Sequence, residues 1–285
     1  MDTYRPQHLK SALQLLKAGK GRYLMIAGGT NMIPDLRAKA IRPKAFIDIS
    51  RFKNLSYIKE EKKEIRIGAL TTISKLADSN TIQLFALPLS QAAQQLGNPL
   101  VRNRATIGGN LADASPAADT APPLLALEAR VVMMREGAKE RSVAIDQFFL
   151  GPNQTRLRRD EMIKEIIFSK VSPHAKTAYF KLGLRNSMAI SIISIALLLE
   201  MEGTFCKKAR IGLGAVAPFP MRAYRTEEML TEEEVTERLL EACGQTVREE
   251  IDPISDIRAS KEYRTEMVSV LLKRLIRQIA FQQPV

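Results

Sequence analysis

The stretch TIGGNLADASPAAD, residues 106–119, carries the clearest structural signal in this chain. Its two consecutive glycines stand between a hydroxyl and an amide side chain, Thr106 and Asn110. Glycine lets the backbone come close to a ligand and lets several N–H groups point into one anion-binding concavity. The small residues that follow leave room for a large flat ligand, and the Asp119 carboxylate can accept hydrogen bonds from sugar or polyol hydroxyls. The stretch therefore predicts one wall of a ligand site.

A second pair of glycines lies about eighty residues earlier, in IAGGTNM at residues 26–32, at the end of an apolar segment. One turn with two glycines is common and has no functional meaning by itself. Two such loops, each with hydroxyl and amide side chains, are better explained as two sides of one phosphate site. We therefore expect a nucleotide between the first glycine loop (residues 26–32) and the second glycine loop (residues 106–110). Close backbone approach and positive φ angles are expected at Gly28 and Gly109.

Other nucleotide-binding motifs do not fit the sequence. GKG at residues 19–21 follows a predicted helix, whereas the dinucleotide fingerprint GxGxxG lies between a strand and a helix. GLGAVA at residues 212–217 follows a strand, but Pro218 and Pro220 prevent a helix from starting there. No GxxxxGKS or GxxxxGKT sequence exists, and no nucleophile–base pair or metal-ligand cluster is evident. We therefore assign no catalytic and no metal-binding residue, and expect a cofactor that carries its own chemistry.

Composition limits the class of protein. With 285 residues, 45% hydrophobic and 26% charged, the chain is long enough for two folded domains. Two cysteines, Cys206 and Cys243, exclude a disulfide framework and are too few for an iron–sulfur cluster with four thiolates. The polar N-terminus does not resemble a signal peptide, and the longest apolar run, residues 189–199, is about half of a bilayer span. We expect a cytoplasmic protein without a transmembrane segment.

The net charge of +12 is concentrated in the N-terminal part of the chain. Residues 1–172 contain 27 Lys and Arg against 16 Asp and Glu, whereas the remaining residues are almost neutral. Such a surface suits nucleic acid, an anionic cofactor or an acidic protein, or it is simply a solvated face. The sequence has no helix-turn-helix, zinc-finger or RNP-type motif and no Trp, so we expect no nucleic-acid partner.

Hydrophobic periodicity predicts an α+β protein with a larger N-terminal and a smaller C-terminal domain. The N-terminal part alternates short helices and strands. We predict helical structure over 71–96 in two pieces around Pro88, and a loop from residue 98 to the helix at 124–129. The expected strands of this part lie at residues 23–27, 45–50, 64–72, 129–134 and 161–170.

The C-terminal part changes character after residue 176. Apolar segments at 178–187, 189–203 and 206–218 are typical of an antiparallel sheet, with a hairpin turn at Glu202-Gly203-Thr204. From Thr226 onward the spacing of apolar residues is helical. We expect one helix to begin after Thr231 with the acidic run 232–234, and a long amphipathic helix to end the chain.

Six segments resemble the FAD-binding subunits of the molybdenum hydroxylases, a group that includes the medium subunit of aerobic carbon monoxide dehydrogenase and the FAD subunit of bacterial xanthine dehydrogenases. Four of the matches are IAGGTN (26–31), EIRIGALTT (64–72), RNRATIGGNLADASPAADTAPPLLALEA (102–129) and AYFKLGLRNSMAISIIS (178–194). The C-terminal matches are GLGAVAPFPMRA (212–223) and DIRASKEYRTEMVSVLLKRLI (256–276). The resemblance covers almost the whole chain in the expected order.

The resemblance implies a fold. It places a two-lobed FAD-binding domain of the PCMH type, also called vanillyl-alcohol-oxidase-like, at residues 1–172, with lobes at about 1–56 and 57–172. A smaller α+β flavoprotein domain like that of carbon monoxide dehydrogenase is implied at residues 176–281.

The resemblance also implies which residues bind FAD. The two glycine loops would enclose the pyrophosphate from opposite sides, through Ile26, Ala27, Gly28, Gly29, Thr30, Asn31 and Met32 and through Thr106, Ile107, Gly108, Gly109 and Asn110. Asp119 would bind hydroxyls of the ribityl chain or beside the phosphates, and Leu96, Ile163 and Lys181 match positions that line the flavin in relatives. The family pattern has Asp where Asn31 stands. An amide keeps an acceptor oxygen, adds a donor and raises the charge by one, so we expect FAD to bind with a slightly shifted potential.

The resemblance implies an electron-transfer function as well. In the family, a molybdopterin centre on a large subunit hydroxylates the substrate, and two 2Fe–2S clusters on a small subunit pass electrons to FAD and then to an acceptor. This chain would be the FAD subunit, with those two subunits as partners. The alternatives are a free-standing FAD-dependent oxidoreductase of the same fold and, more remotely, a basic nucleic-acid-binding or scaffold protein without flavin. The substrate and the acceptor are not encoded in this chain.

Overall fold

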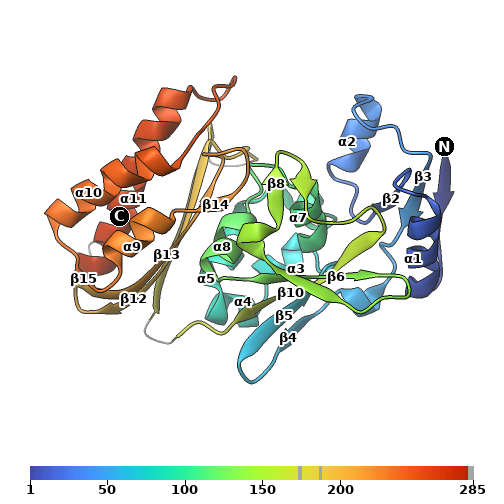
Figure 1. The fold of residues 1–285 in the computed structure, drawn as a ribbon, viewed down its shortest axis with the longest axis horizontal. Coiled ribbons are helices and arrows are strands. Elements are labelled where there is room, and N and C mark those ends of the chain that lie inside the picture. The colour runs from blue at the N-terminus through green and yellow to red at the C-terminus, as the bar shows by residue number, and fades with distance from the viewer. Residues whose placement is uncertain (173–174, 186–187, 282–285) are drawn as a thin grey trace.

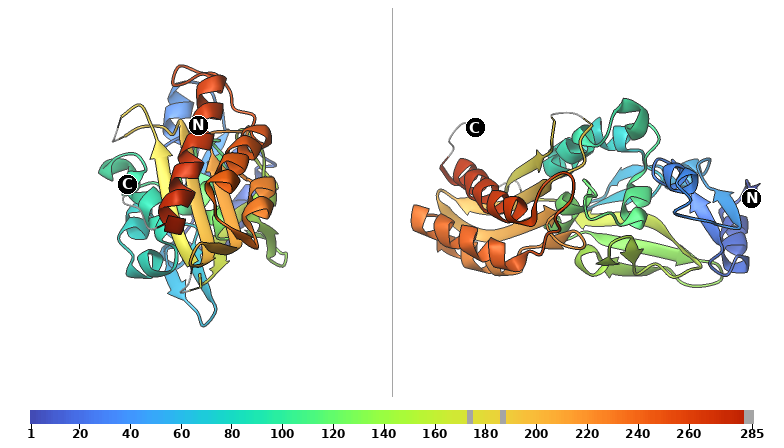
Figure 2. Two further views of the ribbon diagram at one scale, coloured as in Figure 1. Left: turned by 90° about the vertical axis from the view of Figure 1, so that its left-hand side faces the viewer. Right: turned by 90° about the horizontal axis from the view of Figure 1, so that it is seen from above.

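The computed structural model describes residues 1–172, 175–185 and 188–281, and arranges them as three bodies in a row, each built on its own sheet (Figures 1 and 2). The N-terminal body contains the parallel sheet β1-β3-β2, with β1 at Asp2–Tyr4, β2 at Tyr23–Ile26 and β3 at Ala45–Asp48. Helix α1 (Leu9–Ala18) buries its apolar face, Ala12, Leu13 and Leu16, against this sheet. The short helix α2 (Met32–Arg37) follows β2 after the first glycine loop.

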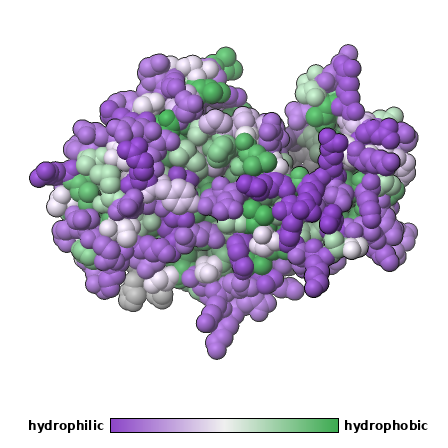
Figure 3. Space-filling view, viewed as in Figure 1, coloured by the Kyte–Doolittle hydropathy of each residue, from purple (hydrophilic) through white to green (hydrophobic). Residues whose placement is uncertain are grey.

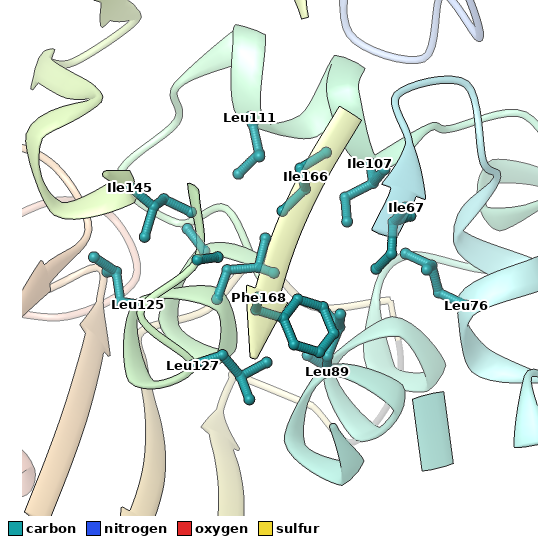
Figure 4. Close-up of a cluster of buried hydrophobic side chains, with 14 of the residues drawn as sticks. Ile67, Leu76, Leu89, Ile107, Leu111, Leu125, Leu127, Ile145, Ile166 and Phe168 are labelled. Atoms are coloured by element: carbon teal, nitrogen blue, oxygen red, sulfur yellow. The ribbon is translucent and has the colours of Figure 1, made fainter. Parts of the chain in front are cut away.

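The middle body contains a five-stranded antiparallel sheet in the order β4-β5-β10-β6-β7. Its strands are β4 (Ile58–Glu60), β5 (Glu64–Gly68), β6 (Arg130–Arg135), β7 (Arg141–Ala144) and β10 (Glu161–Ser169). Its helices are α3 (Ile73–Ala77), α4 (Asn80–Phe85), α5 (Leu87–Gln95), α6 (Pro99–Arg102), α7 (Ile107–Asp113) and α8 (Ala121–Ala126). Side chains from the central strand β10 and from α5, α7 and α8 meet in one core (Figure 4).

Short elements complete this body. Two 3-10 turns lie at η1 (Lys53–Leu55) and η2 (Ile145–Gln147), and the hairpin of β8 (Phe149–Gly151) and β9 (Gln154–Thr155) leads toward β10.

The C-terminal body contains the antiparallel sheet β11-β12-β13-β14, formed by β11 (Ala175–Leu182), β12 (Ile193–Glu202), β13 (Phe205–Gly214) and β14 (Met221–Arg222). The short strand β15 (Glu233–Glu234) also pairs with β13. Helices α9 (Tyr224–Leu230), α10 (Glu237–Glu250) and α11 (Lys261–Phe281) cover one face of this sheet (Figure 2).

The sheet of the C-terminal body is buried on both faces. Ile195, Leu197 and Leu199 of β12 belong to the core under the C-terminal helices, whereas Ala196 and Leu198 belong to the core of the middle body. Because successive side chains of a strand point to opposite faces, β12 contributes to two cores at once. The middle and C-terminal bodies therefore share an apolar boundary.

The fold confirms the predicted α+β class and the β12–β13 hairpin, and it corrects three local predictions. The segment predicted as two helical pieces around Pro88 forms three helices, α3, α4 and α5, and Pro88 lies in the first turn of α5, where proline is tolerated. The expected loop from residue 98 contains α6 and α7. The acidic run at 232–234 is extended, and α10 begins later, with Thr236 as its capping residue.

Among the residues that the structure describes, no helix is both long and apolar enough to cross a membrane. Cys206 and Cys243 are both buried and both free thiols. Burial raises the pKa of the Cys206 thiol to about 11.

Candidate functional site

A cavity of about 560 Å³ lies between the N-terminal and middle bodies, and both glycine loops line it. In the space-filling view, the surface is hollowed beside the part of the N-terminal body that carries α2 (Figure 3). Thirteen of the predicted site residues line this cavity: Ile26, Ala27, Gly28, Gly29, Thr30, Asn31, Met32, Leu96, Thr106, Gly108, Gly109, Asn110 and Ile163. Segments separated by about eighty residues in the sequence thus form the opposite walls of one cavity.

The first glycine loop connects the end of β2 to the start of α2. A side chain at Gly28 would place its Cβ 2.0 Å from the carbonyl oxygen of Arg104, so only glycine allows this backbone contact. Gly29 has a φ of +70°, a left-handed conformation that favours glycine. We predicted a positive φ at Gly28 and at Gly109, and this was wrong for both residues. The residue of the first loop that has a positive φ is Gly29. The two glycines are required for different reasons.

The second glycine loop forms the start of α7. The Thr106 hydroxyl accepts a hydrogen bond from the Gly109 amide at 3.1 Å and so caps this helix. A Cβ at Gly109 would meet only that hydroxyl, at 2.9 Å, because the glycine otherwise faces open space in the cavity. The Asn110 side chain is held by the Thr120 hydroxyl, which donates to it at 2.6 Å.

Ile107 does not line the cavity, contrary to prediction. Its side chain is fully buried in the core of the middle body beside Ile67 and Ile166 (Figure 4). The 3.6-residue period of a helix explains this, because Ile107 and Leu111 lie on one face of α7 and Gly109 lies on another.

Asp119 and Lys181 are also absent from the cavity wall, and they form a buried ion pair at the boundary with the C-terminal body. Lys181 Nζ lies 2.7 Å from Asp119 Oδ2, and the Ser191 hydroxyl donates to Asp119 Oδ1 at 2.7 Å. Burial raises the pKa of Asp119, while the contacts with Lys181 and Ser191 lower it. Their predicted role in binding FAD remains a prediction, and their contacts show that they join two bodies.

The structure adds polar residues that sequence reasoning did not include in the site. Asp35, Asp113, Arg158, Arg159 and Glu161 all line the cavity. Glu161 is buried; burial opposes its ionisation, but the Arg141 guanidinium at 2.6 Å lowers its pKa. In the sequence, Arg158 and Arg159 lie just before β10, which contains the predicted site residue Ile163. This closeness is the one sequence signal that could have placed the two arginines at the cavity.

Asn31 and Asp113 connect the two walls directly. The Asn31 amide donates to Asp113 Oδ2 at 2.7 Å, across 82 positions of sequence. Burial raises the pKa of Asp113, the Asn31 hydrogen bond lowers it, and the nearby Asp35 raises it. The residue that departs from the expected family pattern therefore contacts the opposite wall of the cavity.

These features define a nucleotide pocket between two lobes, followed by a sheet-and-helix domain. Residues 1–170 match the family described as FAD binding domain in molybdopterin dehydrogenase, and residues 178–279 match the CO dehydrogenase flavoprotein C-terminal domain. The chain belongs to the FAD-binding subunits of the molybdenum hydroxylase family. It is thus an FAD-binding component of an oxidoreductase, as the resemblance of its motifs implied.

Named relatives cover nearly the whole chain. It is 31% identical to the nicotinate dehydrogenase FAD-subunit of Eubacterium barkeri, over 96% of this chain and 94% of that protein. It is 30% identical to the xanthine dehydrogenase FAD-binding subunit of Escherichia coli O157:H7, over 96% of this chain and 94% of that one. A chain of the carbon monoxide dehydrogenase of Hydrogenophaga pseudoflava superposes with a TM-score of 0.94 at 29% identity, over 99% of this chain and 97% of that chain.

The cavity fits FAD by its own features. Gly109 leaves open a space that any side chain would enter, and Leu96 and Ile163 provide an apolar wall. Arg158 and Arg159 line the cavity and are exposed to solvent. Their positively charged guanidinium groups can bind the phosphates of a diphosphate ligand. Apolar walls with few polar groups are typical of cofactor sites.

Proposed function

We propose that this chain carries electrons from 2Fe–2S clusters on a partner subunit, through FAD, to an acceptor. The observation that carries the proposal is the cavity between the two glycine loops, in a chain that matches FAD subunits along its whole length. When bound, FAD supplies the redox chemistry. The protein supplies binding and orientation.

The residues of the cavity support separate tasks. The two glycine loops let backbone approach the diphosphate, with Thr30, Thr106 and Asn110 as polar neighbours. Leu96 and Ile163 exclude water from an apolar part of the cavity. The ion pair of Asp119 and Lys181 joins the C-terminal body to the middle body. We also propose that Asp119 accepts hydrogen bonds from hydroxyls of the cofactor.

We propose an iron–sulfur subunit and a molybdopterin subunit as partners. The chain has two cysteines, both buried, and a four-thiolate cluster needs more, so the clusters must belong to another chain. The basic surface of residues 1–172 suits an acidic face of that partner. Unpaired buried thiols also suit the reducing cytoplasm, where we place the protein.

The test is to purify the chain alone and together with the products of neighbouring genes. The isolated chain should contain FAD that dithionite reduces, yet it should oxidise no aldehyde, purine or carbon monoxide. The complex should lose subunits as the salt concentration rises from 0.05 to about 1 M, because the Debye length falls to about 3 Å. Substrate oxidation by the isolated chain, without molybdenum or iron, would contradict the proposal and favour a free-standing oxidoreductase.

A further inference from the structure

The hydrogen bond between Asn31 and Asp113 lies where the two walls of the cavity meet. Asn31 occupies the capping position of α2, but its side chain makes no cap hydrogen bond and instead reaches the last residue of α7. Both residues line the cavity, and Asn31 is exposed at its edge. An amide that leaves its own helix uncapped to reach another lobe is placed to hold two segments together.

A second contact joins the same two segments further along. Gly28 packs directly against the Arg104 backbone, and its carbonyl oxygen accepts a 3.5 Å hydrogen bond from Arg104 Nε. The first glycine loop is therefore tied to the middle body at Gly28 and again at Asn31. The cavity is lined by the residues between these ties, so the ties set the separation of its walls.

The negative charges near this hydrogen bond explain why an amide, and not a carboxylate, suits position 31. Asp113 is half-buried, and Asp35 also lines the cavity close enough to disfavour the Asp113 charge. A carboxylate in place of Asn31 would face Asp113 at hydrogen-bond distance, and two like charges there repel. One amide and one carboxylate form a good hydrogen bond, whichever residue carries which group.

We propose that Asn31 and Asp113 are a positioning pair that fixes the spacing of the two cavity walls and slows the release of the bound dinucleotide. The pair requires one amide and one carboxylate in either order. This inference rests on FAD binding in the cavity. It assigns to Asn31 a specific partner on the opposite wall, Asp113.

The first test is the rate of FAD dissociation from the reconstituted full chain, followed by the recovery of flavin fluorescence. Asp113→Ala should speed dissociation roughly tenfold, because a hydrogen bond to a charged group is lost. Asn31→Asp should speed it at least as much, through repulsion. The double variant N31D/D113N restores one amide and one carboxylate with the net charge unchanged, and it should return within about threefold of the original rate.

A matched control separates the bond from its charge. Asp35→Asn removes a carboxylate from the same cavity and leaves the bond intact, so by charge alone it should slow the release of an anionic ligand. Slower release from Asp113→Ala, as from Asp35→Asn, would overturn the proposal. So would a double variant that releases FAD as fast as Asn31→Asp does.

A second readout needs no flavin. In the FAD-free chain, amide hydrogen exchange in residues 26–37 and 107–114 should accelerate in Asn31→Asp and recover in the double variant. If the chain binds no FAD while this exchange pattern holds, the proposed function and the effect on release both fail, and only the role of the pair in fixing the spacing of the walls stands. If FAD binds but neither exchange nor dissociation responds to Asn31→Asp, the pair alone is refuted.

Discussion

At the scale of single residues, the glycines of the two loops have distinct structural roles. Gly28 is required by its contact with the Arg104 carbonyl, Gly29 by its φ of +70°, and Gly109 by the open space it leaves in the cavity. Their sequence context was the same, a pair flanked by hydroxyl and amide residues. A substitution should therefore have different consequences at each position.

We predict that Gly109→Val keeps the fold and weakens FAD binding by more than tenfold, since the new side chain enters the cavity. Gly28→Ala should instead destabilise the apo-protein by about 1–3 kcal/mol, because its Cβ collides with backbone that cannot rotate away. Urea unfolding and FAD titration measure the two effects. Gly151→Ala is the control, because its Cβ would meet nothing closer than 3.7 Å. Equal loss of stability at Gly28 and Gly109 would contradict this division.

Most residues that line the cavity could be predicted from the sequence, but the hydrogen bond between its two walls could not. Of the thirteen predicted residues that line the cavity, eleven lie in the two glycine loops, which the local pattern of glycine near hydroxyl and amide residues identified. The other two, Leu96 and Ile163, were implied only by the resemblance to the family. The Ile107 side chain lies in the core because the loop is the first turn of a helix, which turns every third or fourth side chain inward, and the predicted contact of Ile107 with FAD stays a prediction. The Asn31–Asp113 bond was not predictable, since it depends on the packing of two lobes and no local pattern connects positions 82 apart.

At the scale of elements, the buried Arg264 of α11 adds polar contacts to the apolar packing of this helix on the sheet. Arg264 donates to the carbonyl oxygens of Ile192 and Ala215, and its Nη2 lies 2.9 Å from Asp256 Oδ1. The Ala215 amide donates to the Pro116 carbonyl at 2.8 Å, and Ser191 donates to Asp119. The start of the last helix thereby supports the segments that contact the middle body.

Asp256 should make this support dependent on pH. Partial burial opposes its ionisation, but hydrogen bonds from the Arg258 and Ala259 backbone and from two guanidinium groups lower its pKa to about 2. The ordinary value is 3.8, so the charged form stabilises the fold above pH 4, and this contribution is lost as the pH falls through 2. Asp256→Asn should therefore lower the free energy of unfolding at pH 6 and have a shrinking effect between pH 4 and 2. An effect that is constant over this range would contradict the assignment.

At the scale of the whole molecule, polar contacts surround the apolar boundary between the middle and C-terminal bodies. Glu128 forms ion pairs with Arg210 at 2.6 Å and with Arg222 at 3.0 Å, and Asp119 pairs with Lys181. Alternate side chains of β12 belong to the core of the middle body and to the core of the C-terminal body. We expect the two bodies to unfold together.

Removing Lys181 tests this coupling. Lys181→Met leaves the Asp119 carboxylate buried without a counter-charge, which should cost about 3–5 kcal/mol of stability. Adding Asp119→Asn should recover part of that loss, because the amide no longer carries a charge. Differential scanning calorimetry of both variants should give one transition each. Additive losses in the double variant, or two separate transitions, would show that the pair does not join the bodies.

Titration of FAD into the apo-protein tests whether FAD binds between the two glycine loops. We expect one FAD to bind per chain and the flavin fluorescence to be quenched. Acid should release intact flavin, because neither glycine loop contains a Cys or His for a covalent link. Gly109→Val, which should still fold cooperatively, should bind FAD more than tenfold more weakly. A folded chain that binds no FAD, or a Gly109→Val variant that binds it as tightly as the original chain, would contradict the account.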